Sequence, residues 1–192
     1  MAQSYQLSRA QPALLQGLLS PFFLLIMVLS SLKGVAPAHI VTALSPFEGL
    51  QIAVPFNVKI SPASNSSLSI SADQQVLNAV NSSVSNKVLY IGTDQNFKTQ
   101  QPISATIFLP AGSLQQISIL SSTNLVAVDD GFSVQALSAR VVGTSTLYFK
   151  NLVAQQLSVT STGYGLPFDF SELQCKQAID QLYGGVLKCP AC

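Results

Sequence analysis

One pattern of residues occurs three times at a spacing of twenty: LQQISI at residues 114–119, VQALSA at 134–139 and AQQLSV at 154–159. A fixed period in this range is typical of solenoid proteins, in which each turn of the chain buries its apolar side against the next turn. Within each copy apolar and polar residues alternate without helical spacing, which indicates β-strands. The repeat therefore predicts an all-β protein, a parallel β-solenoid with coils of about 20 residues.

The same alignment predicts which side chains form the core. Successive residues of a strand point to opposite faces, so the apolar positions should stack inside while the serines at 118, 138 and 158 point outward. The predicted core stack consists of Ile117, Leu137 and Leu157 in one column and of Ile119, Ala139 and Val159 in the next. In this register Leu137 lies directly between Ile117 and Leu157.

The composition excludes several classes of function. Only 9% of the 192 residues are charged, nine basic and eight acidic side chains nearly cancel, and there is a single histidine. Phosphate binding requires a concentrated basic face, so nucleic acid is not expected as a partner. The polar surface must come from Ser, Thr, Asn and Gln instead, which favours a secreted β-protein. The length allows one domain with a substantial core.

Residues 1–38 have the features of a signal peptide. They combine a weakly positive start, an apolar stretch over 18–32 and small residues in Ala36-Pro37-Ala38, where a signal peptidase would read them. Cleavage would then fall between Ala38 and His39. The alternative is a retained signal anchor, in which case the protein would contact a membrane only through this N-terminal segment. Both interpretations place the rest of the chain outside the cytosol.

The remaining chain divides in two. Residues 39–165 consist of short alternating segments separated by turns rich in Pro, Ser and Asn, with a helical turn or two over 73–84 that Asp73 could cap. In residues 166–192 the alternation stops, and Ser171 to Gln174 match a capping box at the start of a helix. The apolar face of this helix would consist of Cys175, Ala178, Ile179 and Leu182. We predict a short C-terminal capping helix that covers the last coil.

A series of segments in the first 110 residues follows an order that is found in a known family. In chain order they are Phe47–Ile52, Pro55–Ile60, Leu68–Asp73, Lys87–Ile91 and the strand that ends at Leu109-Pro110. With the small-residue turns that come after them, they resemble the putative auto-transporter adhesin, head GIN domain family, over about residues 47–165. The resemblance implies a right-handed β-helix on a secreted or surface protein, with adhesion proposed and no established catalytic residues.

Three cysteines lie near the C-terminus, Cys175, Cys189 and Cys192. The last two form a Cys-x-x-Cys motif, but redox use would require a following helix to lower the thiol pKa, and the sequence does not provide one. Zinc needs four ligands, and three cysteines without a nearby histidine fall short. We expect one structural disulfide from Cys175 to either Cys189 or Cys192, and no metal, cofactor or catalytic residue.

Two further motifs concern modification and chemistry. Asn65 and Asn81 each begin an Asn-Ser-Ser sequon, which predicts N-glycosylation if the source is a eukaryote. Asp129-Asp130-Gly131 could contribute oxygens to a calcium site, but the motif does not recur twenty residues later, so we interpret it as a turn. A pair of catalytic carboxylates would have to come from only eight acidic residues.

These observations favour a non-enzymatic extracellular or cell-surface protein, adhesin-like or structural, whose partners would be surface glycans or other extracellular proteins. Two alternatives stay open. One is a secreted β-helix that binds or cleaves polysaccharides, and the other is a membrane-anchored scaffold with a retained N-terminal helix. A cluster of carboxylates on one face would favour the enzyme, whereas an exposed ladder of Ser, Thr, Asn and aromatic side chains would favour binding.

Overall fold

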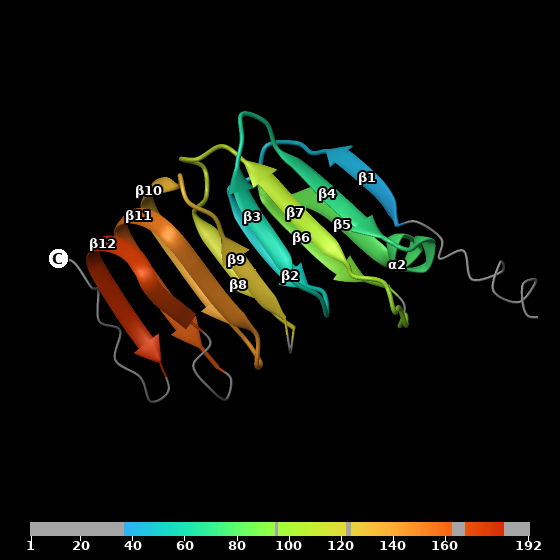
Figure 1. The fold of residues 1–192 in the computed structure, drawn as a ribbon. Coiled ribbons are helices and arrows are strands. Elements are labelled where there is room, and N and C mark those ends of the chain that lie inside the picture. Colours follow the sequence, from blue (N-terminus) through green and yellow to red (C-terminus); the bar gives the residue numbers. More distant parts are fainter. Residues whose placement is uncertain (1–36, 95, 122–123, 163–167, 183–192) are drawn as a thin grey trace, which may run out of the picture. The chain divides into compact units, whose positions relative to one another are not determined.

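The computed structural model describes residues 37–94, 96–121, 124–162 and 168–182, the last range through its backbone. These residues belong to one compact unit, Ala36–Cys192. They form twelve strands and one short helix (Figure 1). Among them no helix is long and apolar enough to cross a membrane. The predicted signal peptide lies outside the described residues, apart from its last two positions.

The elements follow one another along the chain without a second helix in the described part. They are β1 (Ala38–Ala43), β2 (Gly49–Ala53), β3 (Val58–Pro62), β4 (Ser67–Ala72), α2 (Gln74–Ala79), β5 (Val80–Ser85), β6 (Val88–Thr93), β7 (Ser104–Leu109), β8 (Gln116–Ile119), β9 (Leu125–Val128), β10 (Ser133–Val141), β11 (Thr146–Ser161) and β12 (Phe168–Leu182). The prediction of an all-β protein is confirmed.

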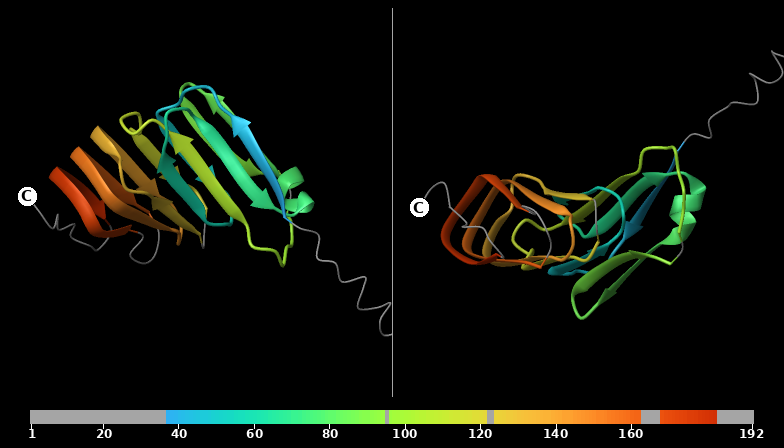
Figure 2. Two further views of the ribbon diagram at one scale, coloured as in Figure 1. Left: turned by 45° about the horizontal axis from the view of Figure 1, so that its top comes forward. Right: turned by 90° about the horizontal axis from the view of Figure 1, so that it is seen from below.

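All twelve strands belong to a single mixed sheet that curls into two wings (Figure 2). The β10 wing contains, in spatial order, β5, β6, β2, β8, β10 and residues 153–161 of β11. The β9 wing contains β1, β4, β7, β3, β9 and residues 146–149 of β11. β11 therefore joins the wings, and β12 pairs with it in parallel. The sheet is mixed because β4 runs antiparallel to β1 and β7, and β5 runs antiparallel to β6.

The core lies between the wings and is built from residues paired across successive strands. On the β10 wing the longest series is Leu89, Leu50, Ile117, Ala139 and Val159, in the order of β6, β2, β8, β10 and β11. On the β9 wing the series Ile107, Ile60, Val128 and Phe149 is fully buried. Each large apolar side chain buried in this way contributes about 1.5–3 kcal/mol to folding. The alternation of the strands is thus explained by one buried face per wing.

The twenty-residue register is confirmed for one pair of strands and wrong for the other. β10 and β11 pair as predicted, with Leu137 opposite Leu157 and Ala139 opposite Val159. β8 is displaced by two residues, so Ile117 pairs with Ala139 and not with Leu137. All six residues of the predicted core stack are at most 2% exposed. The stretch of chain between paired residues is two residues longer from β8 to β10 than from β10 to β11. The hydrogen bonds therefore pair inward-pointing residues of β8 and β10 that the sequence repeat does not align.

The predicted C-terminal capping helix is wrong, because residues 168–182 form the strand β12. Their backbone pairs in parallel along β11, with Ala178 opposite Leu157. An unpaired edge of β11 would leave a row of N–H and C=O groups without partners, and a strand satisfies them along its whole length. A helix of the predicted size is only marginally stable on its own, since isolated helices shorter than about 12–15 residues rarely form. Pairing with the edge of β11 therefore stabilises this segment more than the helix that its residue spacing predicts.

The predicted helical turn after Asp73 is confirmed as α2. The Asp73 carboxylate accepts a hydrogen bond from the backbone N–H of Val76 at 2.9 Å, as an N-cap does. A hydrogen bond from the Thr99 side chain, and then the one from Val76, lower the pKa of Asp73 below its ordinary value. The helix ends after one and a half turns because Val80 already pairs with Thr93 in β5.

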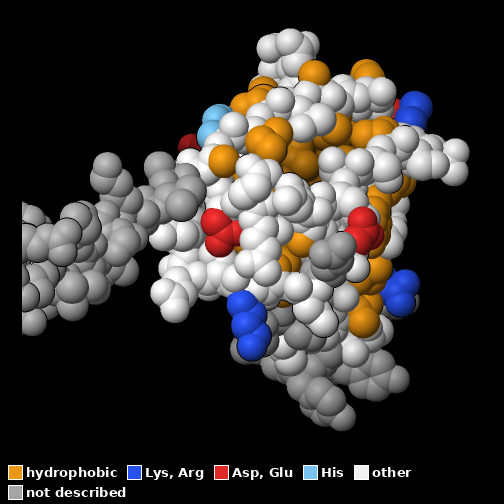
Figure 3. Space-filling view, turned by 90° about the vertical axis from the view of Figure 1, so that its right-hand side faces the viewer, with side chains coloured by type: hydrophobic (Ala, Val, Ile, Leu, Met, Phe, Trp, Pro, Cys, Tyr) orange, Lys and Arg blue, Asp and Glu red, His pale blue; other side chains and the backbone are white. Residues whose placement is uncertain are grey.

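The end of the unit that carries β1 and α2 exposes hydrophobic side chains with few charges among them (Figure 3). β1 pairs with β4 and has little other cover among the described residues, and Ile40 and Val41 are 45% and 60% exposed. It is the least buried strand with described side chains. The better packed part of the molecule lies toward β8, β10 and β11.

Candidate functional site

A groove of about 470 Å³ lies across β8, β10 and β11, on the side of the β10 wing that faces solvent. It is lined by Gly112, Leu114, Gln115, Val134, Gln135, Ala136, Leu137, Ser138, Gln156, Leu157 and Ser158. None of these residues is charged. The exposed ones are glutamines, Ser138, Ala136 and Gly112. The volume is within the usual range for sites that hold a small molecule or part of a chain.

The groove occurs where the length of the repeat changes. In β10 and β11 the wing bends at the same place in both copies, at the exposed pairs Gln135-Ala136 and Gln155-Gln156. The coil of β8 bends at Gln115-Gln116, and Gln116 pairs with Ser138 rather than with Ala136. The bend is thus displaced by two residues between neighbouring strands. The resulting step leaves a hollow that a perfect repeat would have filled.

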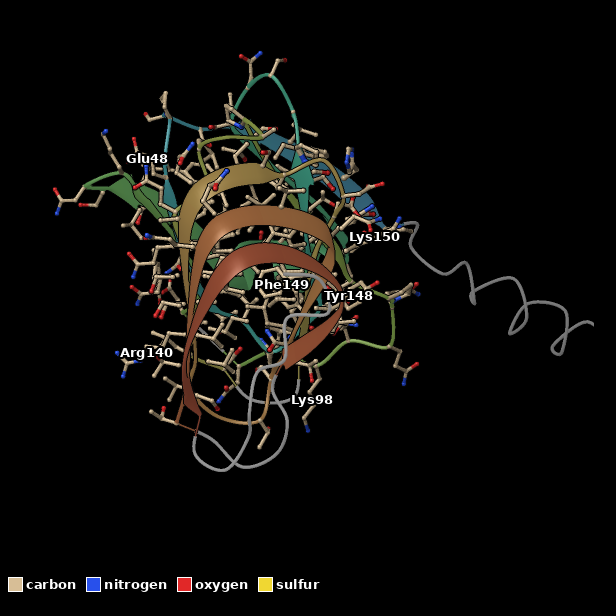
Figure 4. All side chains as sticks on the ribbon, turned by 90° about the vertical axis from the view of Figure 1, so that its left-hand side faces the viewer. Glu48, Lys98, Arg140, Tyr148, Phe149 and Lys150 are labelled. Atoms are coloured by element: carbon tan, nitrogen blue, oxygen red, sulfur yellow. The ribbon has the colours of Figure 1, made fainter. Side chains whose placement is uncertain are left out.

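The outward side chains of the β10 wing form rows of amide and hydroxyl groups. One row contains Gln116, Ser138 and Ser158, and the next contains Gln51, Ser118, Arg140 and Thr160. Arg140 is the only charged member of these two rows, and Figure 4 shows it pointing away from the core, on the opposite side from Lys150. Such rows donate and accept hydrogen bonds without a fixed sign of charge.

A smaller hollow of about 150 Å³ adjoins the groove and shares Gln115 with it. It is bounded by an ion pair between Lys87 Nζ and Glu48 Oε1 at 2.8 Å. Gly49 forms part of its wall, and a Cβ at this position would come within 3.1 Å of the Val88 side chain. The glycine therefore allows β2 and β6 to approach closely while leaving the hollow open.

The carboxylates with described side chains are dispersed, and most already have a partner. Glu48 pairs with Lys87, Asp73 caps α2, and Asp94 accepts a hydrogen bond from the amide of Asn81. Asp129 binds Lys59 at 2.8 Å. No group of three or more His, Cys, Asp or Glu residues that could hold a metal ion is found among the residues that the structure describes. The Asp129-Asp130-Gly131 segment is a turn, with Gly131 at a positive φ of 93°.

Opposing effects determine the pKa of Asp129. Partial burial raises it, but hydrogen bonds from Lys59 and Ser61, with the positive charges of Lys59 and Lys150, lower it by more in sum. The pKa of Asp129 is therefore below the ordinary value for aspartate. A carboxylate held ionised by a lysine and a serine is suited to joining strands and poorly suited to donating a proton in catalysis.

Asparagine side chains that join the turns between the wings were not predicted from the sequence. The Asn124 side chain is 5% exposed and donates from Nδ2 to the Val54 carbonyl at 3.0 Å. Asn57 Oδ1 accepts from the backbone N–H of Leu125 at 2.9 Å. These bonds join the turn after β2 to the turn before β9. Both asparagines follow a strand in chain order, which is a signal that the sequence contains. Their hydrogen-bond partners could not be predicted without knowing which turns are neighbours in space.

The structure places the other predicted positions as follows. Ala38 and His39 begin β1, and His39 Nε2 lies 2.8 Å from Ser69 Oγ. Asn65 is exposed in the turn between β3 and β4. The amide nitrogen of Asn81 is engaged with Asp94, and its Oδ1 is buried without a partner. The backbone of Cys175 lies in β12, while Cys189 and Cys192 lie outside the described residues, so the disulfide stays a prediction.

Comparison with known proteins gives one family and a group of related folds. The family model described as "Putative auto-transporter adhesin, head GIN domain" matches residues 46–167. No curated protein matches the chain in sequence. The resemblance inferred from the order of the segments is thus confirmed over nearly the range expected.

Three bacterial proteins are among the solved structures that align with this chain. A putative adhesin from Bacteroides fragilis aligns with a TM-score of 0.60 at 18% identity, over 66% of this chain and 59% of that chain. This chain therefore spans about three fifths of the length of that protein. A putative adhesin from Parabacteroides distasonis (TM-score 0.42, 12% identity, 66% and 63% covered) and a putative cell adhesion protein from Clostridium sporogenes (0.42, 14%, 65% and 68%) also align.

Proposed function

Because this chain belongs to the putative auto-transporter adhesin, head GIN domain family, we propose that it is a non-enzymatic contact protein that acts outside the cytosol. Its contact surface in this proposal is the outer face of the β10 wing. The B. fragilis protein of similar fold is described as a putative adhesin, which supports the same class of function. The stacked parallel strands from β8 to β11 are interpreted as the coils of a β-solenoid, which presents such a face as a flat array.

One observation supports this proposal above the others, the uncharged groove with its rows of Gln and Ser side chains. Solenoids commonly use extended faces of this kind for binding. The rows come from three different strands whose backbone positions are fixed by pairing on both edges. The polar groups are therefore held in place before a partner arrives, which lowers the entropic cost of binding.

Polysaccharide cleavage receives less support than binding. Glycosidases need two carboxyl groups facing each other about 5–10 Å apart, one of them able to give up a proton. The described residues that line the groove include no carboxylate, and Glu48 at the adjoining hollow is paired with Lys87. A secreted binding module remains compatible with these features.

The test of the proposed function is adhesion by the exported protein. The full chain is expressed in a bacterial host, and intact cells are compared with cells carrying the empty vector for surface labelling and for adhesion to matrix-coated plates. We expect labelling of intact cells or recovery from the medium, and adhesion above the control. Protein found only in the cytosol, or adhesion equal to that of the control, would contradict the proposal.

The state of the N-terminus is determined on the same material. If residues 1–38 are a signal peptide, the exported protein should begin at His39, because Ala36 and Ala38 are small enough for the peptidase. Amino-terminal sequencing decides this. Intact Met1 in a washed membrane fraction would instead support the anchored form of the same contact protein.

A further inference from the structure

We propose that the groove of the β10 wing binds an extended, neutral glycan chain that lies across β8, β10 and β11. This inference rests on the proposed contact function and adds the chemical class of the ligand. It depends on two features of the groove: the lack of charge among its described lining residues and the recurrence of a hydroxyl group from strand to strand.

The first feature is the chemistry of the lining. The side chains that reach the groove and can form hydrogen bonds are Gln115, Gln135, Gln156, Ser138 and Ser158. Amides and hydroxyls both donate and accept, which matches the hydroxyl groups of a sugar. An acidic sugar would have to lose hydration without gaining a cation, since the described residues of the lining include no lysine or arginine. The lining therefore favours a neutral glycan over a uronate or a sulfated chain.

The second feature is repetition. Ser138 pairs with Ser158, and Ala136 pairs with Gln156, so equivalent positions recur on neighbouring strands. Paired strands lie about 4.8 Å apart, a spacing comparable to the length of one sugar ring along a glycan chain. Ala136, an exposed residue of the groove lining, offers a small apolar surface next to these hydroxyl groups. A polymer with one repeated unit can then present the same groups to each strand in turn.

The experiment must separate a glycan from a peptide as the occupant. β10 pairs with β8 only from Ser138 to Val141, so residues 134–137 of β10, which line the groove, have no paired strand on that side among the described residues. A peptide could add to the sheet at this edge through its backbone, which is why a peptide probe is included. No aromatic ring is among the described residues that line the groove, so each site should bind weakly. Useful affinity would then require many copies on a surface, as adhesion provides.

The experiment measures glycan binding by the full-length exported protein, displayed in many copies on beads. The probes are neutral hexasaccharides of glucose, mannose, xylose and galactose, with polygalacturonate as an acidic probe and an unstructured Ser/Gln peptide as a peptide probe. Two groove variants are compared with wild type, Ala136→Trp, which fills the groove, and Gln156→Ala, which removes one amide. Matched controls are Val153→Trp, an exposed position on β11 outside the groove, and Gln75→Ala, at an exposed position on α2 away from the β10 wing.

We expect binding to at least one neutral hexasaccharide, reduced at least tenfold by Ala136→Trp and about two- to tenfold by Gln156→Ala, as for one lost hydrogen bond. Val153→Trp and Gln75→Ala should change it less than twofold. Circular dichroism and the melting temperature verify that each variant is folded. If Ala136→Trp does not fold, Gln156→Ala carries the test.

Three results would overturn the inference: neutral binding that the groove variants leave unchanged, binding to polygalacturonate or the peptide alone, and no binding to any probe. The adhesion assay separates these failures from failure of the proposed function. Adhesion that persists while the groove variants have no effect would refute the glycan site and leave the contact function standing. Loss of adhesion in wild type would refute both.

Discussion

The region from β8 to β11 and the region from β2 to β7 build the same kind of core in different orders. In the first region β10 and β11 are neighbours both in the chain and in space. In the second, β2 lies between β6 and β8, and β3 lies between β7 and β9 (Figure 1). Strands β2 and β3 follow each other in the chain but lie in different wings, and we call them the β2–β3 pair. They are an early part of the chain that lies between two later parts. In one region strands close in sequence pair with each other, and in the other the pairing joins segments distant in sequence.

This difference has a consequence for stability. In a simple solenoid each repeat contacts only its neighbours, so the ends can unfold while the middle stays intact. The β2–β3 pair has neighbours on both sides that come from separate stretches of sequence. Its loss would separate the β4–β7 region from the β8–β12 region. Long-range pairing of this kind also slows folding, because loops must close before the contacts form.

The largest expected effect on stability comes from a substitution in the core of the β2–β3 pair. Ile52 and Leu157 are both almost fully buried, at 0% and 1% exposure, in β2 and β11. Ile52→Asp places an unpaired carboxylate at the junction and should cost several kcal/mol, enough to unfold a marginally stable domain. Leu157→Asp should cost a similar amount locally but leave β2, β3, β6 and β7 folded. Hydrogen exchange followed by mass spectrometry distinguishes global from local loss of protection.

The control for this pair is Gln51→Asp, at the outward neighbour of Ile52, which should retain protection throughout. If Ile52→Asp left β6 and β7 as protected as in wild type, the β2–β3 pair would not join the two regions. Equal global unfolding by both core variants would mean that the molecule behaves as one cooperative unit without a special junction.

The sequence predicts the repeating region better than the inserted one, for a physical reason. Strands β8, β10 and β11 have the same order in space as in the chain. Their pairing therefore produces a repeat in the sequence that can be recognised directly. Leu50 pairs with Leu89 and with Ile117, and neither distance recurs elsewhere. Alternation still predicted that these were strands with one buried face. Which strand lies next to which required the three-dimensional structure.

The second prediction tests the corrected register within the repeating region. Leu137→Ala should destabilise the protein by about 2–5 kcal/mol, as for other buried leucines, whereas Ser138→Ala should stay within about 0.5 kcal/mol. In double-mutant cycles Leu137 should couple to Leu157, its paired neighbour, by about 0.5–3 kcal/mol. Its coupling to Ile117 should be smaller, because Ile117 pairs with Ala139. Chemical denaturation of the single and double variants gives these energies, and equal couplings would restore the simple twenty-residue register.

The same two-residue displacement explains why the groove was not predicted. Its polar residues are visible in the sequence as the glutamines at 115, 135 and 156, and each is unremarkable alone. The hollow depends on Gln116 pairing with Ser138, which the aligned copies LQQISI and VQALSA misplace. The capping helix failed for a related reason, since the spacing of Cys175 and Ala178 is a local signal and the free edge of β11 is not. At residues 168–182 the local pattern predicted a helix, and pairing with the neighbouring strand β11 determined that the segment forms a strand.

The smallest expected effect concerns the contact that joins the two regions on the β9 wing. Asp129, after β9, binds Lys59 Nζ at 2.8 Å and accepts a hydrogen bond from Ser61 Oγ at 2.7 Å, both on β3. The pKa of Asp129 is lower in the folded protein than its ordinary value, so the carboxylate stabilises the fold above about pH 4 and loses this effect as the pH falls through the folded pKa. Lys59 is 54% exposed, so solvent screening limits the gain to about 0.5–1 kcal/mol.

Asp129→Asn should therefore be less stable than wild type by this amount at pH 7, and the difference should shrink toward pH 2.5. Asp130→Asn, at the exposed neighbouring position, is the control and should match wild type. Urea denaturation at a series of pH values measures the difference, and a loss that stays constant down to pH 2.5 would show that the ionised carboxylate does not connect the inserted pair to the repeat.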